Sequence, residues 1–240
     1  MKTHNCEKHG GFEEREITMG AMVITMVKCP DCTKESKRKL EEQELHKEFE
    51  RKKQAKASKR LTAGISRRNL YKSFADLIAA TRSQKKVLAT CMQFVDEFPE
   101  SKNIIMLGKV GTGKTLLASS IIESLIEKHQ CKIIKLIDMI RELKATFSKD
   151  SEATEIKIIK HYSEIPLLII DEVGTQFGSD TEKLLMFDII DGRYQEMKPT
   201  ILISNLNIDG VKELIGERCV DRLREGGGSM IAFDWESERK

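Results

Sequence analysis

The chain has 240 residues, of which 40% are hydrophobic and 33% are charged. We expect one domain of ordinary size plus a small appendage, because single cores commonly saturate above about 100 to 200 residues. The 41 basic and 38 acidic residues leave a net charge of +3, which does not by itself indicate nucleic-acid binding. No apolar run approaches the roughly 18 residues of a membrane span, and the N-terminus lacks a secretory signal, so we expect a cytoplasmic protein.

Residues 1–33 hold a cluster of cysteine and histidine that is typical of a small zinc ribbon or knuckle. A C-x₂-H pair and a C-P-x-C pair supply four candidate zinc ligands, Cys6, His9, Cys29 and Cys32, with His4 as a substitute for His9. A module of this size needs such a staple because its core is small. We also expect a hairpin that turns at Gly20 before the β-prone run Ala21–Val27. The other three cysteines are scattered, which favours a reducing compartment over a disulfide framework.

Residues 34–65 are almost continuously charged, which predicts a solvated helix or linker. From Ser66 to the end, short apolar strands alternate with amphipathic helices. This alternation is typical of an α/β domain with a mainly parallel sheet flanked by helices. Five strands are expected, at Asn103–Leu107, Lys132–Ile137, Pro166–Ile170, Thr200–Ser204 and Met230–Phe233.

The segment GKVGTGKT follows the first of these strands and opens a helix, and it fits the P-loop pattern G-x-x-x-x-G-K-[ST]. Its backbone N–H groups should bind a polyphosphate at the helix N-terminus. Lys114 should reach the β and γ phosphates, and the Thr115 hydroxyl should bind Mg²⁺. The expected nucleotide-binding residues are Gly108, Lys109, Val110, Gly111, Thr112, Gly113, Lys114, Thr115 and Leu116.

The segment PLLIIDE predicts a buried strand that ends on two acidic residues at the ligand edge of the sheet. Asp171 suits Mg²⁺, and Glu172 is placed to polarise an attacking water, which favours hydrolysis. After the next strand, the Asn205 amide should lie at the same edge and contact the γ-phosphate or the water. DEVG also fits a loose GTPase pattern, but the chain has no N-K-x-D sequence, so ATP is favoured over GTP.

The motifs GKVGTGKT, LLIIDE, ILISN, GERCVDRLR and FDWESER, in this order, resemble the AAA+ ATPases of the DnaC and DnaI helicase-loader group. IstB-like transposition ATPases are close relatives. The resemblance covers about residues 66–240, and the cysteine and histidine module resembles the N-terminus of phage and prophage DnaC-like proteins. The resemblance implies that the strand before Asn205 lies in the middle of three strands. One neighbour is the strand that precedes the P-loop with Lys114, and the other is the strand that bears Asp171.

The resemblance also implies a homo-oligomer whose ATP sites are completed by a neighbouring subunit. By this resemblance Arg222 is the arginine finger, Arg218 is a second contact at the interface, and Arg239 is a sensor arginine that acts within its own subunit. Arg224 is left without a role.

Loaders of this group bind a hexameric DnaB-type replicative helicase and place it on single-stranded DNA under the control of ATP. By resemblance, the N-terminal module and charged helix bind the helicase, and Lys144, Phe147 and Ser179 are candidate DNA contacts. Two alternatives remain: an IstB-like ATPase that assists a transposase, and a zinc-bearing DNA-binding adaptor with little ATP turnover.

Overall fold

The computed structural model describes residues 2–19, 22–147, 154–174 and 178–237. The chain divides into two compact units, Met1–Ala55 and Lys56–Lys240, which meet within one long helix, α1 (Pro30–Thr62). This division lies inside the segment 34–65 that the sequence analysis expects as one charged helix or linker. The last turns of that segment belong to the second unit, where Lys56 and Arg60 both pair with Glu123.

The first unit contains two short antiparallel strand pairs and most of α1. Its strands are β1 (Thr3–Cys6), β2 (Gly10–Glu13), β3 (Arg15–Met19) and β4 (Met22–Met26), paired β1 with β2 and β3 with β4. The pairing of β3 with β4 confirms the expected hairpin, although Gly20 lies outside the described residues.

Helix α1 shows that the charged segment is helical as far as Thr62. It begins at Pro30, whose fixed φ suits the first position of a helix and whose missing N–H is not needed there. Ion pairs four residues apart, such as Arg38 with Glu42 and Lys52 with Glu48, support the solvated part of the helix. Arg60 is the only buried residue of α1. The solvated part of the helix therefore depends on local charge pairs for its stability.

The second unit is built on a five-stranded parallel sheet with the order β6-β7-β8-β5-β9. Each strand begins within one residue of its expected position. The strands are β5 (Ile104–Gly108), β6 (Cys131–Lys135), β7 (Leu167–Val173), β8 (Thr200–Ser204) and β9 (Ser229–Phe233). Strand β8 lies between β5 and β7, as the resemblance implied.

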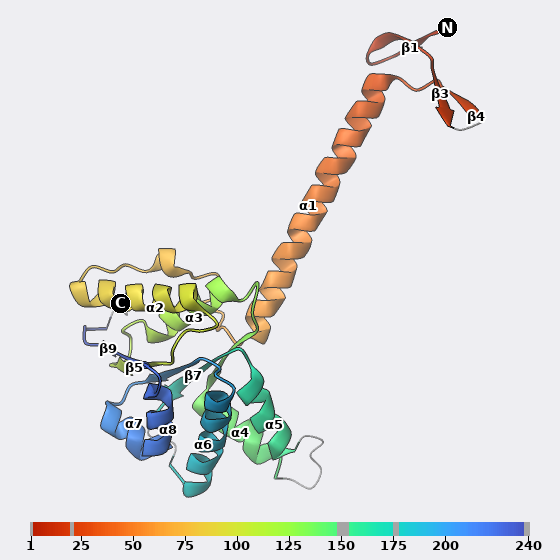
Figure 1. Cartoon of the computed structure of the whole chain (residues 1–240). Helices are drawn as coiled ribbons and strands as arrows, with labels where there is room; N and C mark the ends of the chain where they lie inside the picture. The colour runs from red at the N-terminus through yellow and green to blue at the C-terminus, as the bar shows by residue number, and fades with distance from the viewer. Residues whose placement is uncertain (1, 20–21, 148–153, 175–177, 238–240) are drawn as a thin grey trace. The chain divides into compact units, whose positions relative to one another are not determined.

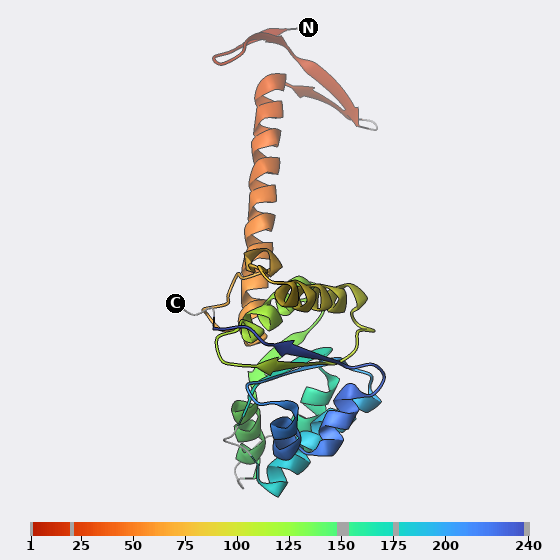
Figure 2. The same ribbon diagram turned by 90° about the vertical axis from the view of Figure 1, so that its left-hand side faces the viewer.

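Helices cover both faces of this sheet (Figures 1 and 2). Side chains alternate along each strand, so Ile104 and Met106 of β5 pack into one core while Ile105 and Leu107 pack into the other. This explains why the central strands β5, β7 and β8 contain continuous apolar runs. Helices α2 (Arg82–Glu97) and α3 (Lys114–Leu125), with η1 (Phe74–Asp76), lie on the first face, and the second is covered by α4 (Leu136–Ala145), α5 (Glu155–Glu164), α6 (Asp180–Gln195), α7 (Ile208–Ile215) and α8 (Glu217–Arg224).

The second core also contains a fully buried arginine, Arg193 of α6. Its guanidinium donates to carbonyl oxygens of Tyr162, Ile165 and Pro199 at 2.6 to 2.7 Å and to the Thr200 hydroxyl at 2.8 Å. It thereby joins the end of α5 to the start of β8. Within the described residues, every helix is either too short or too polar to cross a bilayer.

Candidate nucleotide and metal sites

A cavity of about 530 Å³ lies at the carboxyl ends of the central strands. Its walls include most of the P-loop, from Val110 to Leu116, together with Asp171, Glu172 and Asn205. One cavity of a single chain therefore brings together most of the residues that the sequence analysis assigned to ATP binding and hydrolysis.

Two glycines allow the P-loop to take its shape. Gly108 has a φ of 147°, and a Cβ there would lie 2.3 Å from the carbonyl oxygen of Phe233 on β9. Gly113 has a φ of 92° and is the N-cap of α3, which begins at Lys114. The loop can thus turn into the helix with its N–H groups at the positive end of the helix dipole, which suits an anion.

Lys114 is buried within the loop, where its Nζ donates to the carbonyl oxygens of Gly108 at 2.6 Å and Lys109 at 2.7 Å. Next to it, the Thr115 hydroxyl donates to Oδ2 of Asp171 at 2.9 Å. A hydroxyl and a carboxylate in contact are the oxygen ligands that Mg²⁺ prefers, so these two residues fit the expected ion. Burial raises the pKa of the Asp171 carboxyl, which reflects the cost of an anion here without a cation.

A bulge in the pairing of β7 with β8 positions the acidic pair. The register shifts between Ile170 and Val173, and Glu172 takes a left-handed φ of 54°. Bulges of this kind redirect side chains next to functional sites, and a non-glycine residue in this conformation stores strain. The Glu172 carboxylate is half exposed and pairs with Lys135 Nζ at 2.9 Å.

The end of β8 is tied to the end of β7 through Ser204. Its hydroxyl donates to the Val173 carbonyl and accepts from the Leu206 N–H at 3.0 Å. These bonds hold the backbone on both sides of Asn205, whose exposed side chain lines the cavity. Asn205 thus lines the same cavity as the P-loop and the acidic pair.

Sequence reasoning missed several residues of this site. Ser66, Arg68 and Asn69 line the cavity, and Asn69 donates to the Ser119 hydroxyl of α3 at 3.3 Å. Lys135 was also missed, because the strand was expected to continue to Ile137, whereas it ends at Lys135. The indole Nε1 of Trp235 donates to the Thr112 carbonyl at 3.2 Å, a long-range contact with no local signal.

Arg218 and Arg222, which the resemblance assigned to a subunit interface, lie one turn apart on α8 and are not among the residues that line the cavity of their own chain. Arg218 is exposed. Arg222 donates from Nε to Asp191 at 3.0 Å and lies 4.2 Å above the Tyr194 ring. Arg239 lies outside the described residues.

The three candidate DNA contacts differ in what surrounds them. Phe147, just after α4, is 54% exposed. Lys144 Nζ lies 2.8 Å from the Glu182 carboxylate, and Ser179 is the N-cap of α6, where its hydroxyl accepts from the Glu182 N–H. Two of the three candidate side chains, those of Lys144 and Ser179, therefore already contact Glu182 of the same chain.

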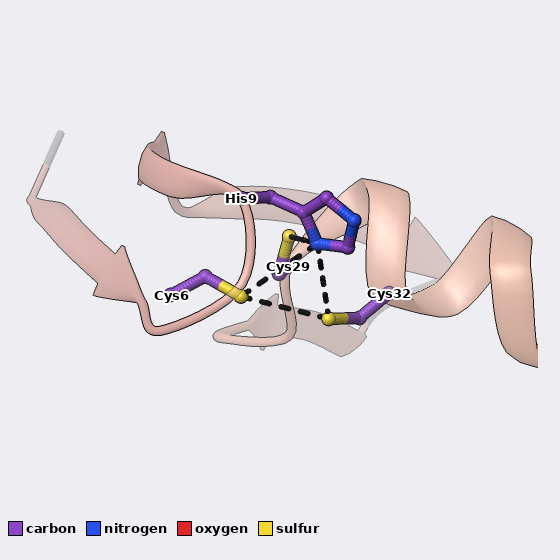
Figure 3. A group of neighbouring side chains, drawn as sticks. All are labelled: Cys6, His9, Cys29 and Cys32. Carbon is purple, nitrogen blue, oxygen red and sulfur yellow. Dashed lines mark hydrogen bonds between the residues drawn. The ribbon is translucent and has the colours of Figure 1, made fainter.

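The expected zinc ligands Cys6, His9, Cys29 and Cys32 form a cluster whose ligand atoms all lie within 4.8 Å of one another (Figure 3). His9 Nδ1 is 3.8, 3.7 and 3.3 Å from the sulfurs of Cys6, Cys29 and Cys32, and the first and last sulfurs are 3.5 Å apart. Around a tetrahedral zinc, sulfur atoms lie about 3.8 Å apart and sulfur and nitrogen about 3.5 Å. The residues therefore fit Zn²⁺, and His4 instead pairs with Glu14 at 3.3 Å.

Hydrogen bonds within the cluster shift the pKa values of two of its thiols in opposite directions. Backbone N–H groups of Lys8 and His9 donate to the Cys6 sulfur and lower the pKa of its thiol to about 6. The hydrogen bond of the Cys32 thiol to that sulfur, together with the loss of solvent around it, raises the pKa of the Cys32 thiol to about 11.

Comparison with known proteins gives consistent relatives. The profile of the family described as IstB-like ATP binding protein matches residues 19–222. The replicative helicase loader DnaC of Buchnera aphidicola subsp. Schizaphis graminum is 36% identical over 180 residues, which cover 74% of this chain and 73% of that protein. DnaC of Escherichia coli strain K12 is 34% identical over 169 residues, which cover 70% of this chain and 69% of that protein.

Solved structures agree. The DnaC helicase loader superposes with a TM-score of 0.62 at 25% identity, over 70% of this chain and 99% of that chain. AMPPCP-bound DnaA from Aquifex aeolicus superposes with a TM-score of 0.59 at 20% identity, over 67% of this chain and 49% of that chain, which is a likeness of fold alone. The AAA+ fold expected from the sequence is confirmed.

Proposed function

This chain belongs to the family of IstB-like ATP-binding proteins, among its DnaC-like members, and we propose that it loads a DnaB-type replicative helicase onto single-stranded DNA. It is a P-loop ATPase of the AAA+ type. The observation that supports the loading role best is the 36% identity to a DnaC loader over most of both chains. We expect this role in the cytoplasm, as the sequence predicts.

In the proposed reaction the P-loop N–H groups bind the ATP phosphates, and Lys114 turns from the carbonyl oxygens of its own loop towards them. Thr115 and Asp171 would hold Mg²⁺, which neutralises phosphate charge when bound. Glu172 orients and polarises the attacking water, and Asn205 contacts the water or the γ-phosphate.

We further propose that hydrolysis requires a neighbouring subunit. Arg222 would enter the neighbour's cavity as the finger, with Arg218 as a second interface contact. Their common face on α8 supports this pairing, and the ion pair of Arg222 with Asp191 would open when the neighbour docks. Arg239 is kept as the proposed sensor arginine. ATP binding and hydrolysis would then switch the oligomer between loading and release.

Single-stranded DNA is the proposed nucleic-acid partner. The exposed ring of Phe147 supports base stacking, which is tolerant of sequence. Lys144 and Ser179 remain candidate contacts to phosphate, although binding there would compete with their contacts to Glu182.

The N-terminal unit is proposed to hold a structural Zn²⁺ and to bind the helicase together with α1. The fit of the four ligand atoms to a tetrahedron supports the zinc. The cysteine and histidine module favours a loader of the phage or prophage type.

The deciding experiment is co-purification of the full chain with a DnaB-type helicase, with and without ATP. A loader forms a complex that responds to ATP, and the helicase and single-stranded DNA change its rate of ATP hydrolysis. A Lys114→Ala variant serves as the nucleotide-blind control. Absence of any complex with the host or phage helicase would overturn the proposal.

A second candidate function is that of an ATPase assisting a transposase, because the matching family is described as IstB-like. This function predicts a preference for duplex DNA over single strands. Titration of both DNA forms onto the ATP-bound protein separates the two candidates.

A further inference from the structure

His9 is held from both sides of its ring, and only one side faces the three cysteines. Nδ1 points to the three sulfurs, whereas Figure 3 shows the second ring nitrogen pointing away from them. That second nitrogen, Nε2, lies 3.2 Å from Oε1 of Glu35. The ring therefore has one nitrogen for a metal and one for a carboxylate.

Glu35 reaches this place because of its position on α1. Cys32 and Glu35 are three residues apart on one face of α1, and Cys29 directly precedes the helix. The other carboxylate oxygen of Glu35 pairs with the ammonium of Lys8, which directly precedes His9. The carboxylate thus connects the loop between β1 and β2 to the beginning of α1.

A histidine binds a metal as a ligand only through a nitrogen that has no proton, so the other nitrogen must hold the proton. A carboxylate that accepts this N–H fixes the tautomer and the orientation of the ring and makes the ligand nitrogen more basic. The Glu35 carboxylate lies within hydrogen-bond distance of Nε2 and can accept this N–H.

We infer that Glu35, supported by Lys8, is a positioning residue for the zinc site: it accepts the Nε2–H of His9 so that Nδ1 binds the metal. This inference rests on the zinc proposed above. Neither the spacing of the cysteines and histidine nor the comparison with relatives assigns a role to Glu35.

The test compares zinc affinities of the full chain by competition with a chromogenic chelator at constant pH. Glu35→Gln and Glu35→Ala should weaken zinc binding about 10- to 100-fold, the usual effect of removing a carboxylate behind a ligand histidine. Glu42→Gln is the matched control, since Glu42 is also a glutamate of α1 with a basic partner, Arg38, but lies away from the cysteine and histidine cluster. It should leave the affinity unchanged.

A second comparison asks whether Glu35 acts through the histidine ring. In a His9→Cys background the ligand is a thiolate that needs no tautomer, so Glu35→Gln should no longer change the affinity. The same loss in both backgrounds would reduce Glu35 to a nearby negative charge and overturn the inference. Long-range ¹H–¹⁵N spectra of the zinc-bound wild type should show the proton of His9 on Nε2, and a proton on Nδ1 would also overturn it.

The metal content of the wild type separates the two levels of the argument. One equivalent of zinc together with unchanged affinity in the Glu35 variants removes the inference and leaves the zinc site. A wild type that binds no zinc removes both.

Discussion

The ammonium of Lys135 lies 2.9 Å from the carboxylate of Glu172, so the residue proposed to polarise the attacking water is tied to the neighbouring strand. The two side chains are about equally exposed at the mouth of the nucleotide cavity, and Glu172 raises the pKa of the Lys135 ammonium. Glu172 must leave this partner, at least in part, to face the γ-phosphate.

Replacing Lys135 by methionine should therefore raise the basal rate of ATP hydrolysis. An exposed ion pair contributes about 0.2–1 kcal/mol, which limits the increase to roughly fivefold. Phosphate release at saturating ATP measures it, with Lys132→Met on the same strand as the control. A lower rate with unchanged ATP affinity would show instead that Lys135 stabilises the transition state.

Arg222 and Glu172 should act on the same ATP from different subunits. Arg222→Ala and Glu172→Gln should each bind ATP, and each alone should hydrolyse it at least about 10³-fold more slowly when assembled. A mixture of the two should regain activity, because roughly a quarter of the interfaces in a ring then combine an intact Glu172 with an intact Arg222.

The control for this mixing experiment is Arg224→Ala, which is expected to be active on its own because Arg224 has no assigned role on α8. If the mixture of Arg222→Ala with Glu172→Gln stays inactive while both variants still assemble, Arg222 does not act between subunits.

The sequence predicted the core of the ATPase unit well because its signals are local. The P-loop follows a strand and opens a helix, so one motif placed Lys114 and Thr115, and each apolar run placed a strand to within one residue at its start. Sheet order came from the resemblance alone, since strand composition says nothing about which strands pair.

What the sequence did not predict depends on contacts between distant segments. Arg193 looks like an ordinary surface arginine of a helix, yet it is buried among backbone carbonyl groups. Glu35 looks like one glutamate among many in a charged helix. The left-handed backbone of Glu172 follows from the bulge against β8, which no pattern in LLIIDE encodes.

Removal of zinc should separate helicase capture from nucleotide binding. The four ligands belong to the unit Met1–Ala55, whereas the nucleotide cavity belongs to the unit Lys56–Lys240 with its own core. A strong chelator should lower helicase capture at least about tenfold and leave ATP affinity unchanged, and added zinc should restore capture. Capture that survives full removal of the metal would contradict a helicase-binding role for the zinc-stabilised module.

The single tryptophan of the chain should report nucleotide binding. Trp235 donates to the carbonyl of Thr112 inside the P-loop, and its ring lies 4.9 Å from that of Phe233. Because phosphate is proposed to draw Lys114 away from the carbonyl oxygens of this loop, ATP should change the fluorescence of Trp235. Lys114→Ala should abolish the change, and a signal that persists in that variant would place its origin elsewhere.

Glu182 should make the second unit sensitive to acid. Burial disfavours its charged form, but the ion pair with Lys144 and the N–H donors of Gly178 and Ser179 outweigh burial and lower its pKa from 4.5 to about 2. A carboxyl whose pKa is lower in the folded state stabilises the protein above its unfolded pKa, and this contribution is lost as pH falls from about 4.5 towards 2.

Glu182→Gln should therefore lower the free energy of unfolding at pH 7 by about 1–3 kcal/mol, and the difference from the wild type should vanish near pH 2. Urea unfolding across this range measures the effect, with the exposed Glu196→Gln, just beyond α6, as the control.

Glu182→Gln also tests whether Lys144 contacts DNA. It frees Lys144 from its ion pair and leaves an amide that can still serve the capping box with Ser179. If Lys144 contacts DNA phosphate, Glu182→Gln should bind single-stranded DNA more tightly despite its lower stability, and unchanged affinity would remove Lys144 from the DNA-binding surface.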